Sequence, residues 1–154
     1  MLSTLLTPAI IKTNLESTEK DEVLEELLEV LVSAHPEIDR QEALDALNLR
    51  ETKMSTGVIP GIAVPHAVCK SVRGISAAVG MSRSGIDYDS LDGSPVHFII
   101  MLLFEQGETE SHLQMMRDIA VLLQHHDFLK IVMEKKTSQE VFDELCNFEL
   151  EQQE

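Results

Sequence analysis

The sequence predicts an α/β fold, a single-domain sandwich in which a mixed β-sheet is flanked by helices on both faces. Segments with helical apolar spacing stand toward both ends of the chain, and segments rich in β-branched residues, Gly and Pro lie between them. With 154 residues, 44% of them hydrophobic, and no internal repeat, one compact domain is expected. We place this domain at residues 1–148 and expect residues 149–154 to form a frayed acidic tail.

Two helices are predicted in the N-terminal third. Over residues 19–34, apolar side chains recur every three or four positions above an acidic outer face, and Ser17 or Thr18 would cap this helix. Residues 39–49 repeat the pattern over a shorter stretch, and Asp39 would cap that second helix.

Three strands are predicted in the middle of the chain. The first covers residues 62–64 and stops at Pro65, directly before His66, because proline cannot donate to a strand ladder. The others cover residues 75–82 and 95–104. The run at 95–104 is almost uninterruptedly apolar, which is typical of a strand buried on both faces.

The C-terminal third returns to helical spacing. Ser111, with Gln114 in the capping-box position, is expected to open one helix. Thr137, with Glu140 three residues later, is expected to open the last helix, which would end at Phe148.

The composition restricts the kinds of partner. With 27 Asp and Glu against 12 Lys and Arg, the formal net charge of −15 would repel nucleic acid and anionic membranes, and a basic protein partner fits better. The two cysteines, Cys69 and Cys146, form no CxxC pair, so neither a disulfide framework nor a zinc knuckle is expected. The N-terminus lacks a basic signal region and no apolar run reaches about 18 residues, so we expect a cytoplasmic protein that is not inserted in the membrane.

His66 is the strongest candidate for chemistry. It follows the segment Gly61-Ile62-Ala63-Val64-Pro65, which would deliver an imidazole to the rim of the sheet beside a glycine-bearing loop with free backbone N–H groups. A neutral imidazole is a nucleophile at physiological pH and can carry a phosphoryl group. A strand-end histidine satisfied by a backbone carbonyl fits the same residues, and spacing alone leaves both readings open.

His112 and Arg50 are weaker candidates. His112 would lie in the first turn of the helix opened by Ser111, where free N–H groups and the helix dipole favour an anion, although exposed polar residues are common there. Arg50, near the end of the second helix, could donate to phosphate oxygens or simply complement the helix dipole.

The other polar clusters give no site. The acid spacing in residues 87–93 is wrong for a calcium loop, and the twelfth position, where such a loop carries a glutamate, is Phe98. His66, His112 and a carboxylate could bind zinc by residue type, but the chain lacks HExxH and CxxC spacing. No metal is therefore expected.

A longer stretch around His66 carries a specific resemblance. Residues 55–67, STGVIPGIAVPHA, closely resemble the STGIGNGIAIPHA signature of the fructose/mannitol-type EIIA domains (EIIA type 2) of the phosphoenolpyruvate-dependent sugar phosphotransferase system, which include a nitrogen-regulatory branch. The resemblance extends to residues 48–51, to 85–96 (GIDYDSLDGSPV beside the family's GIDFDSLDGKPV) and to the helix start at 111–116, and it covers residues 2–148.

The resemblance implies a phosphotransferase component that carries phosphate on His66. His112 and Arg50 would then stabilise the phosphoryl group, and Ser55, Thr56, Gly57 and Gly61 would belong to the phosphate-binding loop. The phosphodonor would be the small carrier HPr or its nitrogen-system relative, and the acceptor a cysteine of an EIIB domain or a regulatory target protein. No cofactor is implied.

Two departures from the family pattern affect the expected site. Ile59-Pro60 replaces a glycine and an asparagine, so the loop has one fewer N–H donor for an anion. The loop at residues 105–110 is unusually acidic, and acid pointing at His66 would raise its pKa.

Three functions therefore stay open: a carrier for sugar uptake, a regulatory protein whose partner binding depends on its phosphorylation, and a degenerate binder that no longer accepts phosphate. The third is motivated by Pro60.

Overall fold

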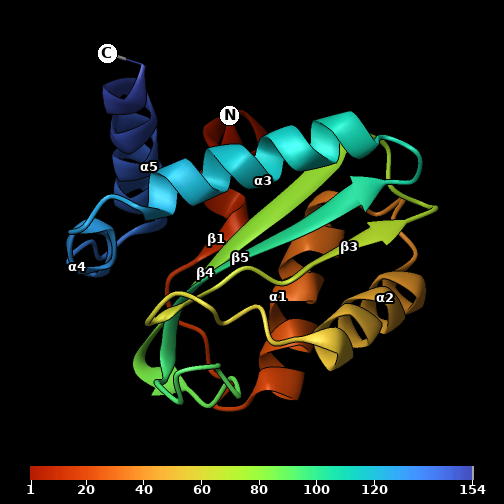
Figure 1. Cartoon of the computed structure of the whole chain (residues 1–154), viewed down its shortest axis with the longest axis horizontal. Coiled ribbons are helices and arrows are strands. Elements are labelled where there is room, and N and C mark those ends of the chain that lie inside the picture. The colour runs from red at the N-terminus through yellow and green to blue at the C-terminus, as the bar shows by residue number, and fades with distance from the viewer. Residues whose placement is uncertain (154) are drawn as a thin grey trace.

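The computed structural model describes residues 1–153, which form five strands, five α-helices and two 3-10 turns. The fold is the predicted α/β sandwich, with a mixed sheet between two layers of helices (Figure 1). The elements, in chain order, are the 3-10 turns Leu2–Leu5 and Pro8–Ile10, β1 Ile11–Lys12, α1 Lys20–Ala34, α2 Arg40–Lys53, β2 Ile62–Ala63, β3 His66–Cys69, β4 Ile75–Ile86, β5 Val96–Glu105, α3 Thr109–Leu123, α4 Phe128–Met133 and α5 Ser138–Gln152.

Strand β5 is the centre of the sheet. It pairs antiparallel with β4 on one side and parallel with both β2 and β3 on the other, while β1 pairs parallel with the far side of β4. Every residue of β5 from Phe98 to Phe104 is buried, which confirms the predicted strand with two covered faces.

The alternating side chains of β5 supply two separate cores. Phe98, Ile100, Leu102 and Phe104 pack with the N-terminal turns, α3, α4 and α5. Ile99, Met101 and Leu103 pack with α1 and α2 on the other face. In Figure 1, α3 crosses one face of the sheet while α1 and α2 lie across the other.

Two of the predicted helix caps are confirmed. The side chain of Asp39 accepts a hydrogen bond from the backbone N–H of Glu42 (3.1 Å), and α2 then continues to Lys53. Thr137 accepts from the N–H of Glu140 (3.1 Å) and opens α5.

Two other predicted caps are wrong, although the first of these helices begins within one residue of its expected start. The N-cap of α1 is Glu19, because the hydroxyl of Ser17 is engaged elsewhere, donating to the carboxylate of Glu26 (2.6 Å). Helix α3 begins at Thr109, two residues before Ser111, so His112 is the fourth residue of the helix. The bond from Ser17 to Glu26 joins residues nine positions apart, and a local capping pattern does not contain it.

The chain does not leave the sheet at Pro65. Strand β3 begins at His66, and its register continues that of β2: Ile62 faces Phe98, and His66 faces Leu102. Proline removes only a donor, and the carbonyl of Pro65 still accepts from the N–H of Leu102 (3.0 Å). The expected strand end before His66 is therefore a two-residue interruption, Val64 and Pro65, between β2 and β3.

The C-terminal region is more ordered than predicted. Helix α4 was not expected, and α5 runs past residue 148 to Gln152 instead of fraying. Glu149, only 5% exposed, accepts hydrogen bonds from the backbone N–H (2.8 Å) and hydroxyl (3.1 Å) of Ser3. Residue 154 lies outside the described part of the chain.

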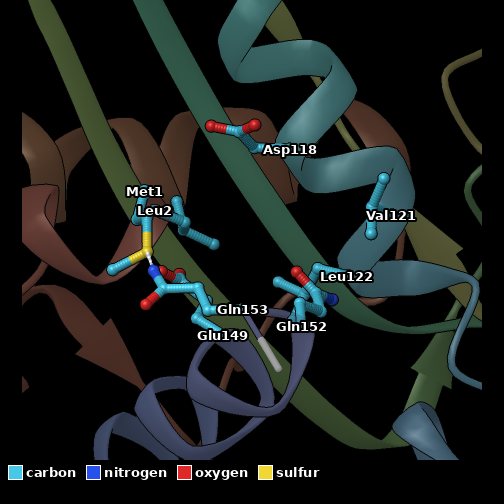
Figure 2. Close-up of a pocket in the computed structure, with 8 residues that line it drawn as sticks. All are labelled: Met1, Leu2, Asp118, Val121, Leu122, Glu149, Gln152 and Gln153. Atoms are coloured by element: carbon cyan, nitrogen blue, oxygen red, sulfur yellow. Dashed lines mark hydrogen bonds between the residues drawn. The ribbon is translucent and has the colours of Figure 1, made fainter.

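The two ends of the chain thus pack side by side. Between them and α3 lies a hollow of about 260 Å³ (Figure 2), which contains none of the candidate site residues. Its lining residues are Met1, Leu2, Asp118, Val121, Leu122, Glu149, Gln152 and Gln153.

The packing of α5 gives a stability test with a matched control. Leu145 is 0% exposed and Leu150 is 58% exposed on the same helix. We expect Leu145→Ala to lower the free energy of unfolding by about 2–5 kcal/mol, since it leaves a cavity in the core. Leu150→Ala should change it by less than about 0.5 kcal/mol. Urea unfolding followed by circular dichroism measures both, and equal effects would contradict the docking of α5 described above.

Candidate functional site

The side chain of His66 is held by a backbone carbonyl at one ring nitrogen. Its Nδ1 lies 2.8 Å from the carbonyl oxygen of Val64, two residues earlier. A carbonyl can only accept, so Nδ1 carries the hydrogen and Nε2 of the neutral ring keeps its lone pair. The two readings left open by the sequence are therefore compatible, because the carbonyl satisfies one nitrogen and leaves the other available as a nucleophile.

Burial keeps this imidazole neutral. It lowers the pKa of His66 below the ordinary 6.5, and the positive charge of Arg50 lowers it further, while the Val64 carbonyl and the charge of Glu51 work against the shift. The ring is thus uncharged at neutral pH. The carboxylate whose charge affects the pKa of His66 is that of Glu51. In the acidic loop, Glu105 turns instead to the N–H of Gly74 (2.7 Å).

His112 lies beside His66, so the fold brings the two candidate histidines together. Their ring centroids are 5.9 Å apart at an interplanar angle of 76°. The ring of His112 also stacks on Phe104, with centroids 3.9 Å apart and planes at 15°. Burial, and then repulsion from His66 when that ring is protonated, lower the pKa of His112 below its ordinary value.

The support of His112 differs from the prediction. Its backbone N–H already donates to the carbonyl of Glu108 (3.1 Å), so this N–H is not free for an anion. The imidazole itself, supported by Phe104, is the group that faces His66. Phe104 was not identified from the sequence, because only the fold brings the end of β5 against α3.

Two clefts open beside His66, and Arg50 lines both. The first, the apolar cleft, has a volume of about 220 Å³ and is lined by Arg50, Met54, Ser55, Thr56, Val58, Ile59, Val64, His66, Met116, Ile119, Ala120 and Leu123. The second, the basic cleft, has a volume of about 320 Å³ and is lined by Ala46, Leu49, Arg50, Lys53, His66, Ala67, Val68 and His112. An anion is favoured in the basic cleft, where two permanent cations and both histidines meet.

Arg50 and Lys53 supply those cations from the last turn of α2. One guanidinium nitrogen of Arg50 donates to the carbonyl of Met54 (2.9 Å), which fixes the side chain at the helix end. Arg50 also lies where a cation complements the helix dipole, because it stands in the last turn of α2. Lys53 was missed, although its position three residues after Arg50 places both on one face of the helix.

The loop after α2 contributes fewer free N–H groups than expected. Ser55 and Thr56 line the apolar cleft, but the N–H of Thr56 donates to Glu51 (3.2 Å) and that of Gly57 to the hydroxyl of Ser55 (3.1 Å). Gly57 has a packing role, since a Cβ there would lie 2.8 Å from the hydroxyl oxygen of Ser90.

Pro60 and Gly61 form a tight turn. The N–H of Ile62 donates to the carbonyl of Ile59 (3.0 Å), and Gly61 has φ of 79°, so proline stands at the second turn position and glycine at the third. Neither residue lines the two clefts. Proline suits this turn because its second position needs φ near −65°. Since Pro60 lines neither cleft, the residue at this position does not contribute to their walls.

A buried carboxylate ties the loop to the rest of the protein. Glu51, 8% exposed, accepts from the N–H and the hydroxyl of Thr56 and from the hydroxyl of Tyr88 (2.9 Å). It also pairs with the ammonium group of Lys20 (3.0 Å). Burial, and then the charge of Glu51, raise the pKa of Tyr88, so this phenol stays protonated and donates.

The remaining histidines lie away from these clefts. His97 has its Nδ1 2.8 Å from the carbonyl of Ser82. His125 and His126 stack on each other near the end of α3. Within residues 1–153, no three His, Cys, Asp or Glu side chains are grouped so that they could hold a metal ion, and no helix is long and apolar enough to span a bilayer.

Comparison with known proteins adds relatives of two kinds. The fructose-specific EIIA component of Haloferax volcanii is 34% identical over 145 residues, 94% of each chain. The nitrogen regulatory protein of Pseudomonas aeruginosa is 35% identical over 126 residues, 82% of each chain. The fructose-specific EIIABC component of Bacillus subtilis is 37% identical over 92% of this chain, which spans only 22% of that larger protein.

Solved structures share the fold. The nitrogen regulatory protein IIA-Ntr of Neisseria meningitidis superposes with a TM-score of 0.86 at 24% identity, covering 94% of this chain and 98% of that one. The enzyme IIAMtl of Escherichia coli, solved in complex with phosphorylated enzyme IIBMtl, gives 0.75 at 19% identity, covering 92% and 97%.

A family model matches nearly the whole chain. It covers residues 4–147 and is described as phosphoenolpyruvate-dependent sugar phosphotransferase system, EIIA 2. The match includes β3 with His66, the start of α3 with His112 and the end of α2 with Arg50. The chain therefore belongs to the EIIA 2 family of the phosphoenolpyruvate-dependent sugar phosphotransferase system.

Proposed function

We propose that this chain is a phosphohistidine carrier that accepts a phosphoryl group on Nε2 of His66 from phospho-HPr, or from the nitrogen-system relative of HPr, and passes it to a cysteine of an EIIB domain. The observation that carries the proposal is the bond between Nδ1 of His66 and the Val64 carbonyl, which leaves a neutral, unprotonated Nε2 beside two cations. Sequence relatives that transfer phosphate as EIIA components support it.

The transfer follows from this arrangement. The lone pair of Nε2 attacks the phosphorus, and the P–N bond of the donor phosphohistidine breaks with its electron pair returning to the donor ring. Arg50 and Lys53 neutralise the phosphoryl oxygens in the basic cleft, and His112 donates to them from α3. The Val64 carbonyl stabilises the positive charge that develops on the attacking ring.

Onward transfer needs an acceptor that enters the same clefts. A thiolate of an EIIB domain would attack the phosphorus, and the P–N bond to His66 would break as the ring becomes neutral again. The complex of enzyme IIAMtl with phosphorylated enzyme IIBMtl supports this choice of acceptor.

The second candidate is a regulatory protein whose partner binding depends on the phosphorylation of His66, with no role in sugar transport. The likeness to the nitrogen regulatory protein of Pseudomonas aeruginosa over 82% of each chain favours it. Both functions use the same histidine. Genes for sugar permease components beside this gene would support transport, and their absence from the genome would support regulation.

The central test is labelling by phosphoenolpyruvate, enzyme I and HPr. We expect one acid-labile, base-stable phosphoryl group per chain in the wild type and none in His66→Ala, because, of the two histidines that line the basic cleft, it is His66 whose Nδ1–H is held by a carbonyl, which leaves Nε2 as the nucleophile. His97→Ala is the matched control, since His97 has the same Nδ1–carbonyl bond but lies elsewhere and should keep the label. A stable label on His66→Ala would overturn the proposed function.

The role of His112 is tested by single-turnover transfer to an EIIB cysteine. His112→Ala should fold and still accept phosphate on His66, but transfer it about 10- to 1,000-fold more slowly, the usual range for losing one donor at a transferring group. His112→Gln, which keeps an N–H donor, should recover part of the rate. A wild-type transfer rate in His112→Ala would show that His112 takes no part in transfer and only packs on Phe104.

The pH profile tests the neutral imidazole. Because burial lowers the pKa of His66, the nucleophilic form persists to lower pH than in a free imidazole, and the rate of phosphorylation at saturating donor should reach half of its plateau only below pH 6.5. Arg50→Gln removes a charge that lowers this pKa, so its profile should begin to fall at higher pH. A wild-type rate that already declines between pH 8 and 7 would contradict the assignment.

A further inference from the structure

We infer that Glu51 is a positioning residue, which acts through Thr56 and Val64 to hold the imidazole of His66 in its reactive orientation. The inference rests on the proposed function, because it concerns the rate at which His66 accepts phosphate. It adds a residue that contacts neither the phosphoryl group nor His66.

The carboxylate of Glu51 collects donors from three separate segments. One oxygen accepts from the hydroxyl groups of Thr56 and Tyr88, and the other accepts from the N–H of Thr56 and from the ammonium group of Lys20. The hydroxyl groups of Thr56 and Tyr88 also lie 3.0 Å apart. With four donors around it, this nearly buried carboxylate is fully satisfied and held in one place.

Hydrogen bonds lead from this carboxylate to His66. The N–H of Thr56 donates to Glu51 (3.2 Å), and the carbonyl of Thr56 accepts from the N–H of Val64 (3.3 Å). The carbonyl of Val64 then accepts from Nδ1 of His66 (2.8 Å). The position of the Val64 carbonyl, and with it the tautomer and direction of the ring, therefore depends on where Glu51 holds Thr56.

The same carboxylate fixes the cation next to it in sequence. Arg50 precedes Glu51 in the last turn of α2 and lines both clefts with His66. Because Glu51 anchors this turn to the loop, one buried carboxylate positions both the imidazole of His66 and the neighbouring guanidinium of Arg50. Small displacements of such groups reduce transfer rates strongly.

The test compares Glu51→Gln with the wild type. The amide keeps the size of the side chain but can accept at one oxygen only. Either the hydroxyl groups of Thr56 and Tyr88 or the N–H of Thr56 and the ammonium group of Lys20 therefore lose their acceptor, and Thr56 loses a bond in both cases. We expect single-turnover phosphorylation of His66 at saturating donor to slow about 10- to 100-fold, with little change in the KM for the donor. In the unphosphorylated protein, ¹⁵N NMR of the imidazole should change from one Nδ1–H tautomer to a mixture.

Glu26→Gln is the matched control for a loss of stability alone. Glu26 on α1 has the same kind of partners, with Lys12 at 2.8 Å, the hydroxyl of Ser17 at 2.6 Å and backbone N–H groups of Glu16 and Ser17. It has no bond to the loop at residues 55–61. This variant should lose stability yet keep the wild-type rate and the single Nδ1–H tautomer.

A folded Glu51→Gln that keeps the wild-type rate and tautomer overturns the inference, and so does a Glu26→Gln that slows transfer equally. Thr56→Val, which removes only the hydroxyl donor, decides the question if Glu51→Gln does not fold, and should slow phosphorylation about 3- to 10-fold. The NMR readout needs no phosphate, so it still tests Glu51 if the labelling of His66→Ala shows the proposed function to be wrong.

Discussion

The structure depends on the burial of β5 on both faces. This strand pairs with β4, β2 and β3, and its alternating side chains enter both cores. It also builds the candidate site, because the pairing of Leu102 with His66 places the proposed nucleophile in the sheet. Phe104, two residues further along, supports the ring of His112. A shift of β5 by one residue would exchange its two faces and separate the two histidines.

Long periodic segments made most of the fold predictable. The apolar repeats of α1, α3 and α5, the run of β5 and the caps at Asp39 and Thr137 are local signals. Two of the failures involve distant contacts. Ser17 is drawn from its helix by Glu26, and Glu149 is ordered by Ser3 at the other end of the chain. The short helix α4 has too few residues for a periodic pattern.

The site was only partly visible in the sequence. His66, His112 and Arg50 could be named because the motifs around them are specific, but their proximity comes from the fold. The expectation that loop N–H groups face an anion is wrong for Thr56 and Gly57, whose donors are already bound. Side-chain acceptors such as Glu51 compete for these donors, and a linear motif does not show which acceptor wins.

The pairing of the chain ends has a consequence for how this domain can be connected. Gln153 donates to the sulfur of Met1 (2.7 Å), and the backbone N–H of Ser3 donates to Glu149. The first and last described residues therefore lie next to each other (Figure 1). The hollow between them shares no lining residue with the clefts around His66. A neighbouring domain attached there, or a circular permutation that joins the ends by a short linker, would leave the clefts beside His66 uncovered.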